Sequence, residues 1–164
     1  MKLHCSLALV ALGLLPRGVV IDYKEIEAPP DGYDHDRFAP AVGVDDVEKT
    51  FKAYVTCMDG ADDDDGDGVA DKWGIPHWVS YELRRFPGDL PKSPKRPSTW
   101  ITDTDHYDPD GDDGIAPHDD SYRNSGYNRG HLCMKHHAWR LGENADWNTH
   151  TFLNCVPQKG KFNQ

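Results

Sequence analysis

Three stretches rich in aspartate, proline or glycine divide this chain and separate the segments that can form regular structure. Residues 59–71 hold seven aspartates in thirteen positions, four prolines stand between Pro87 and Pro97, and residues 103–120 are acidic and contain glycine. Proline lacks an amide donor and fixes φ, and crowded carboxylates repel one another. We therefore expect loops or extended connections at these three places, with short regular elements between them.

The segments between these stretches show the patterns of short elements. In residues 78–83 the odd and even positions form two faces, as in a half-buried strand. Residues 98–103 are expected to form a short strand, and residues 129–133 and 150–156 two further strands that flank a polar stretch with a helical turn. In residues 47–58 the periodicity does not decide between helix and strand.

Length and charge limit the class of protein. A chain of 164 residues is long enough for one domain with its own core. With 18 Lys and Arg against 28 Asp and Glu, the net charge of −10 argues against a protein that coats nucleic acid by charge alone. It does not exclude an enzyme that acts on nucleic acid, because a small basic site or a bound cation supplies positive charge locally.

The N-terminus has the pattern of an export signal. A basic start at Lys2 precedes the apolar run Ser6–Leu15, which has the length of a signal peptide and is too short to span a membrane. We predict a signal peptide at residues 1–18 and a secreted or periplasmic domain at residues 19–164, with no membrane segment in the mature form. A small-x-small cleavage pattern is missing, so a buried N-terminal strand or helix is the alternative.

The first aspartate-rich stretch matches the spacing of a calcium loop. Alternate positions bring oxygen ligands together around one hard cation, and a glycine at position 6 permits the turn. The predicted Ca²⁺ ligands are Asp63, Asp65, Asp67, Val69 through its carbonyl, and Asp71. Gly74 stands where an EF-hand has glutamate, so the loop is closer to the DxDGDGxxD calcium repeats of extracellular proteins. The alternative is a solvated acidic loop, which is what we expect of Asp108–Asp113.

A second chemical pattern lies in "YNRGHLCMKHH", residues 127–137. On a strand, Arg129 and His131 share one face. Arginine suits phosphate through its planar donor fork, and neutral histidine suits proton transfer from water near pH 7. A zinc site of His131, Cys133, His136 and His137 lacks the usual ligand spacing. The alternative is that these are ordinary surface histidines. That interpretation explains His136 and His137 but not the local Arg-Gly-His pattern.

Three linked motifs carry a resemblance to a known family. "YNRGHL" at 127–132 and "TFLNCVPQKGKFNQ" at 151–164 resemble the DNA/RNA non-specific endonucleases, the ββα-metal, endonuclease G-like nucleases. The family pattern is D/N-R-G-H, then an asparagine before x-x-P-Q, then a second asparagine nine positions later. Asn154 and Asn163 reproduce that spacing. The resemblance runs from about residue 78 to residue 164.

The resemblance implies an α+β, ββα-metal nuclease fold with an antiparallel sheet and flanking helices. It implies that His131 is the general base and that Asn163 is the protein ligand of a catalytic Mg²⁺. Asn154 would support the site by hydrogen bonding, while Arg129 and Arg96 would hold phosphate oxygens and the charge of the transition state. The implied reaction is in-line hydrolysis of the phosphodiester backbone of DNA and RNA with low sequence specificity.

The sequence departs from the family pattern at two places, and these departures bear on whether the domain is complete and active. Asn128 stands where many members have aspartate, and the sequence ends at Gln164, one residue past the predicted metal ligand, where relatives continue with a helix. The resemblance therefore implies an N-terminal portion of the domain, apparently truncated at its C-terminus. The rival hypothesis is a catalytically inactive, calcium-binding extracellular module with a nuclease-like sequence.

The resemblance also concerns the cysteines. It implies that "RGHLC" and "TFLNC" are neighbouring antiparallel strands, which allows a disulfide between Cys133 and Cys155 and leaves Cys57 free. The alternative is two small buried residues with free thiols.

Overall fold

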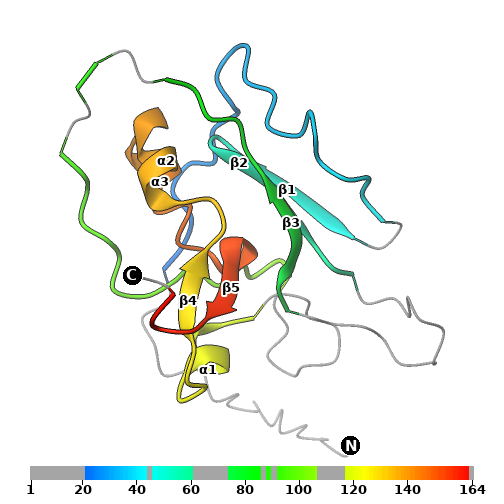
Figure 1. Ribbon diagram of the computed structural model, residues 1–164, viewed down its shortest axis with the longest axis vertical. Helices are drawn as coiled ribbons and strands as arrows, with labels where there is room; N and C mark the ends of the chain where they lie inside the picture. Colours follow the sequence, from blue (N-terminus) through cyan, green and yellow to red (C-terminus); the bar gives the residue numbers. More distant parts are fainter. Residues whose placement is uncertain are drawn as a thin grey trace, which may run out of the picture.

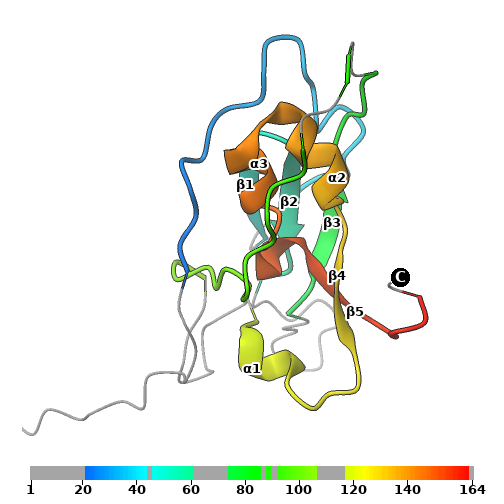
Figure 2. The same cartoon turned by 90° about the vertical axis from the view of Figure 1, so that its left-hand side faces the viewer.

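The structure is a computed structural model that describes residues 21–43, 46–60, 74–85, 88–89, 92–106 and 117–162. Short strands and helices alternate in it with irregular connections (Figures 1 and 2). None of the helices in these ranges is long and apolar enough to cross a membrane. Several predictions from the sequence lie outside the described residues, namely the signal peptide at 1–18, the calcium ligands Asp63, Asp65, Asp67, Val69 and Asp71, and the magnesium ligand Asn163.

The first sheet has three antiparallel strands in the order β1-β2-β3. β1 (Val47–Phe51) and β2 (Tyr54–Met58) form a hairpin, which decides the question that periodicity left open for residues 47–58. All five residues of the central strand β2 are buried. β3 (Pro76–Ser80) pairs with the other edge of β2, so the predicted strand at 78–83 begins earlier and ends earlier than expected.

The second sheet is the pair β4 (Asn128–His131) and β5 (Cys155–Gln158). The elements around this pair are α1 (Asp119–Tyr122), α2 (Lys135–Ala138), the 3-10 helix η1 (Trp139–Leu141), α3 (Glu143–Trp147) and the 3-10 helix η2 (Phe152–Asn154). Figure 1 shows β4 and β5 side by side, with α2 and α3 beyond one end of β4. The antiparallel pairing confirms an α+β domain. The specific ββα-metal arrangement stays a prediction.

Two strand predictions were wrong in part. Residues 152–154 form a 3-10 turn because the Thr151 hydroxyl accepts a hydrogen bond from the amide of Leu153, so the strand begins only at Cys155. Within residues 98–103, ladder pairing is limited to one isolated parallel bridge between Ile101 and Thr151.

The core joins the first sheet to the helical segment. Phe51 and Tyr54 stack with ring centroids 4.7 Å apart, and both belong to a buried cluster with Ala138, Ala145 and Leu153. A hydrogen bond also joins this sheet to the turn after α3, because Tyr54 Oη of β2 donates to the Asn148 carbonyl at 2.8 Å. The three-stranded sheet therefore backs the segment that leads into β5.

The segment from residue 21 onward packs on the same core. Tyr23 Oη donates to Asp103 Oδ2 at 2.8 Å and lies 2.7 Å from Thr151 Oγ1. The Lys24 amide donates to Asn148 Oδ1 at 3.0 Å. This irregular lead-in is thus bonded to the turns that precede β5.

The three described cysteines, Cys57, Cys133 and Cys155, are buried free thiols. The structure agrees with the alternative of buried free thiols and not with the Cys133–Cys155 disulfide that the resemblance allows. β4 ends at His131, which is the register partner of Cys155. Cys133 lies two residues beyond, and its thiol faces the Ala53 carbonyl at 4.0 Å. Cys155 instead donates to Tyr122 Oη at 3.4 Å.

Candidate active site

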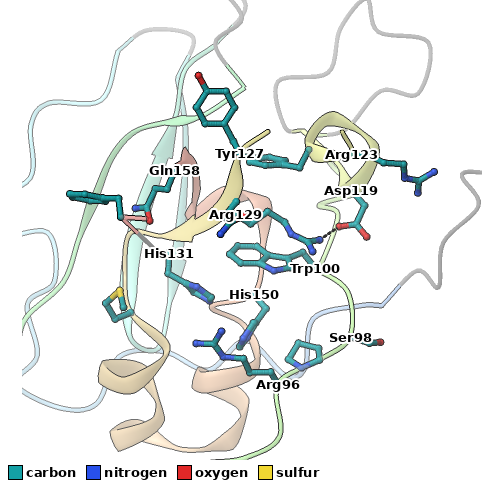
Figure 3. A pocket seen from close by; sticks show the side chains of 15 residues that line it. Arg96, Ser98, Trp100, Asp119, Arg123, Tyr127, Arg129, His131, His150 and Gln158 are labelled. Atoms are coloured by element: carbon teal, nitrogen blue, oxygen red, sulfur yellow. Dashed lines mark hydrogen bonds and ion pairs between the residues drawn. The ribbon is translucent and has the colours of Figure 1, made fainter. Parts of the chain in front are cut away.

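A cleft of about 730 Å³ opens beside β4. Its walls come from the connection before Ile101, from α1, from both strands of the second sheet and from the turn after α3 (Figure 3). The described residues that line it are Arg96, Pro97, Ser98, Trp100, Asp119, Tyr122, Arg123, Tyr127, Asn128, Arg129, His131, Met134, His150, Gln158 and Phe162. Three residues singled out from the sequence, Arg96, Arg129 and His131, thus lie together.

His131 is the last residue of β4, and its ring is enclosed by two other rings. The ring centroid lies 4.5 Å from that of Trp100 and 4.8 Å from that of His150, which meets it edge-on. Among the described residues, His131 Nε2 has no hydrogen-bond partner. Burial, followed by the neighbouring His150, Arg96 and Lys135, lowers the pKa of His131 to about 3. The imidazole is therefore neutral at physiological pH, the form that accepts a proton.

His150 and Trp100 are site residues that the sequence did not reveal. His150 is 2% exposed, and burial lowers its pKa to about 4. The Trp100 ring centroid is 5.8 Å from that of His150 and 5.8 Å from that of Phe152. Trp100 thereby holds the two histidine rings against the core. Trp100 lies in the segment that the resemblance covers, but neither residue was singled out from the sequence, and the packing of distant segments identifies both.

Arg129 lies on the same face of β4 as His131, as the strand alternation predicted. Its guanidinium is paired with Asp119, the first residue of α1, and its Cζ lies 5.8 Å from the Trp100 ring centroid (Figure 3). Asp119 also accepts a hydrogen bond from Thr99 Oγ1 at 2.6 Å. Asp119 is the one carboxylate among the described residues that line the cleft. The sequence did not point to this residue because it lies within an acidic stretch that has the pattern of a loop.

Arg96 is exposed and reaches the cleft from the proline-rich connection. This connection is fastened by Lys135 of α2, whose Nζ donates to Ser93 Oγ at 2.7 Å and to the Pro94 carbonyl at 3.0 Å. The same Nζ is 3.1 Å from Asp146 Oδ1 of α3. Through this buried lysine, the helices set the position of the segment that carries Arg96.

Two arginines and a neutral histidine around one cleft suit a phosphodiester substrate, and comparison with known sequences agrees with this chemistry. The sequence model of the DNA/RNA non-specific endonucleases matches residues 35–164. The chain belongs to the DNA/RNA non-specific endonuclease family. Searches for similar curated proteins and for similar solved structures find no match. Family membership implies nuclease chemistry that generally depends on a metal, and it does not favour the inactive calcium-binding module.

In this nuclease domain, Asn154 lies behind the cleft and is fully buried. Its Oδ1 accepts a hydrogen bond from the Cys133 amide at 2.7 Å, and its Nδ2 donates to the carbonyls of Cys133 at 2.9 Å and Thr149 at 3.0 Å. The side chain thus joins the turn that follows His131 to the turn that precedes His150. Asn154 fixes the backbone around both histidines and does not touch the cleft itself.

Two residues of the nuclease motifs fit against each other across the second sheet. A Cβ atom at Gly130 would overlap the side chain of Gln158, which lines the cleft from β5. Glycine in the Arg-Gly-His motif therefore makes room for the glutamine of the Pro-Gln motif. The two motifs form one structural unit although they lie far apart in the sequence.

Proposed function

We propose that this nuclease domain hydrolyses phosphodiester bonds of DNA and RNA in a Mg²⁺-dependent reaction in which His131 is the general base. The observation that supports the proposal most directly is the neutral imidazole of His131 in a cleft with Arg96 and Arg129. In the reaction, His131 takes a proton from water, the water oxygen bonds to phosphorus, and the bond from phosphorus to the 3′ oxygen breaks.

Substrate binding improves His131 as a base. In the protein without substrate, the pKa of His131 is about 3, so its imidazole holds a proton weakly. A bound phosphodiester brings negative charge next to the ring, which favours the protonated form and raises the pKa. Burial therefore keeps the base unprotonated before the substrate arrives, and the substrate's own charge supports protonation during attack.

The two arginines hold the nonbridging oxygens of the phosphate. Arg129 reaches the substrate from its pair with Asp119, so phosphate competes with the Asp119 carboxylate for the guanidinium. Arg96 approaches from the opposite wall with an exposed side chain. Such contacts involve the phosphate backbone of the nucleic acid and not the edges of its bases, which fits a nuclease with low sequence specificity.

Asn163 is the proposed protein ligand of Mg²⁺. It lies outside the described residues, but Phe162, the residue before it, lines the cleft. An amide oxygen with waters and substrate phosphate is a donor set that Mg²⁺ accepts. When bound, the ion would stabilise the charge on the leaving 3′ oxygen. His131 and the arginines perform the proton transfer and the substrate binding.

Export and a structural Ca²⁺ belong to the same proposal and rest on the sequence alone. The apolar run Ser6–Leu15 supports export, and the spacing of Asp63, Asp65, Asp67, Val69 and Asp71 supports calcium. If the calcium loop forms, millimolar Ca²⁺ raises the Tm of the protein. A Tm indifferent to Ca²⁺ rejects the loop site, and an exported protein that still begins at Met1 rejects the signal.

The decisive experiment incubates the purified chain with supercoiled plasmid DNA and, separately, with RNA. Each substrate is treated in Mg²⁺ and in excess EDTA. We expect both substrates to be cut in Mg²⁺ without fixed fragment lengths, and neither to be cut in EDTA. Cleavage that persists in EDTA, or no cleavage by a folded protein under any metal, contradicts the proposal.

A further inference from the structure

A second group of possible metal ligands lies where β2 ends and β3 begins, and none of its members lines the cleft. Asp46 stands just before β1, Asp59 just after β2, and His77 on β3. His77 Nε2 is 2.8 Å from Asp59 Oδ1, and His77 Nδ1 is 3.6 Å from Asp46 Oδ2. One ligand atom from each residue falls within 4.8 Å of the others.

The register of the sheet directs His77 toward the two carboxylates. Cys57 of β2 pairs with Trp78, whereas the next residue, Met58, pairs with Pro76. His77 is therefore the extra residue of a β-bulge. A bulge interrupts the ladder and changes the direction of a side chain, and such bulges are common next to functional sites.

Both carboxylates are largely shielded from solvent, and Asp46 is held in place by backbone amides. The side chains of Asp46 and Asp59 are 9% and 1% exposed, against 41% for His77. Asp46 Oδ2 accepts a hydrogen bond from the Gly43 amide at 2.8 Å, and its Oδ1 accepts one from the Gly60 amide at 3.3 Å. The chain segments before β1 and after β2 thus fix this ligand before any ion binds.

Charge favours a divalent cation at this position. One imidazole nitrogen and two carboxylate oxygens converge here, and carboxylates attract a divalent cation. The exposed side of His77 leaves room for a water ligand. The combination of one nitrogen and two carboxylate oxygens suits Zn²⁺ or a similar transition metal, whereas Ca²⁺ and Mg²⁺ prefer oxygen ligands alone.

We propose that Asp46, Asp59 and His77 form a structural site for a divalent transition metal of the Zn²⁺ class, separate from the catalytic metal of the nuclease. The thiol of Cys57, 3.6 Å from Asp46 Oδ2, is a further sulfur donor beside the site. The bound ion joins the chain before β1 to β2 and β3. It thereby stabilises the sheet that backs the nuclease motifs.

Zinc binding by the metal-stripped chain tests the site. Titration with Zn²⁺ is followed by calorimetry and by Tm, for the wild type, for His77→Gln and for the control His136→Gln, which removes an exposed histidine on α2. We expect one equivalent of Zn²⁺ to bind the wild type and the control with the same Kd and to raise their Tm. In His77→Gln, Kd should rise at least tenfold. Equal binding to all three, or no binding to the wild type, overturns the proposal.

Two further measurements distinguish this site from zinc bound at another place on the chain. Co²⁺ bound to the wild type should show the absorption bands of a histidine-coordinated ion, and their absence contradicts the ligand set even if His77→Gln does not fold. The rise in Tm with Zn²⁺ should persist in His131→Asn, because His131 is not a ligand. A loss of that rise would place the zinc in the cleft and overturn the proposal.

Discussion

The neutral state of His131 has a measurable consequence for the pH dependence of catalysis. The profile of kcat/KM reports the free enzyme, in which the pKa of His131 is about 3. An ordinary histidine with a pKa of ~6.5 is about 90% protonated at pH 5.5. We therefore expect kcat/KM to be nearly equal at pH 5.5 and pH 7.5, because the base form is retained.

The profile of kcat should differ from that of kcat/KM. It reports the enzyme with substrate bound, whose phosphate raises the pKa of His131. The acid limb of kcat should therefore lie at higher pH than the acid limb of kcat/KM. If kcat/KM falls tenfold per pH unit below pH 6.5, the free imidazole is an ordinary one and the buried geometry of His131 is wrong.

At the scale of elements, the contact between α1 and β4 controls Arg129. Asp119 holds the guanidinium that the substrate phosphate needs. Replacing Asp119 by asparagine removes this competition, so KM for DNA should fall about two- to fivefold, the effect of a partly exposed ion pair of ~0.5–1 kcal/mol. The value of kcat should change little, which steady-state kinetics at constant salt will show.

The neighbouring Asp120 gives a matched control for this prediction. It carries the same charge but pairs, 2.6 Å away, with Arg123, which also lines the cleft, and not with Arg129. Asp120→Asn should not reproduce the lower KM of Asp119→Asn. A large loss of kcat in Asp119→Asn would instead mean that the carboxylate is required to orient Arg129 for the reaction.

The elements also show which parts of the site a sequence can reveal. Arg129 and His131 share a face because strand alternation is a local property, and this was predictable. His150 and Asp119 reach the cleft only through packing between segments that no local pattern connects. The turn at residues 152–154 has the sequence pattern of a strand, because the short apolar run gives no sign that Thr151 caps a 3-10 helix.

The group of Asp46, Asp59 and His77 also could not be predicted from local sequence patterns. Its members lie on three separate segments, and a β-bulge that cannot be read from the sequence turns His77 toward the others. The antiparallel α+β class, in contrast, followed from the resemblance to the family, which rests on motif spacing.

For the whole molecule, the two histidines of the cleft, His131 and His150, couple stability to pH. The folded-state pKa values of His131 and His150 are about 3 and about 4, below the ordinary value near ~6.5 that holds after unfolding. Between these values the unfolded chain binds more protons than the folded chain, so stability falls as the pH falls from about 6.5 toward about 4.

Each histidine should lower the free energy of unfolding by up to ~1.4 kcal/mol per pH unit in this window. Urea unfolding at pH 7, 6 and 5 measures the slope. His150→Asn should reduce the slope by about one proton's contribution. Buried carboxylates such as Asp103, whose pKa is lowered, lose their stabilising effect only at more acidic pH. A free energy of unfolding that is constant from pH 7 to pH 5 would show that the histidines are not buried in their neutral form.

The measurement that tests the central claim most directly is the rate of DNA cleavage by His131→Asn in Mg²⁺. It is compared with the wild type and with His136→Asn, which changes an exposed histidine on α2, after circular dichroism has shown that all three are folded. Loss of a general base should slow cleavage by ~10²–10⁴-fold in His131→Asn and leave His136→Asn at the wild-type rate. A folded His131→Asn that cuts DNA as fast as the wild type would contradict the assignment of His131 as the base.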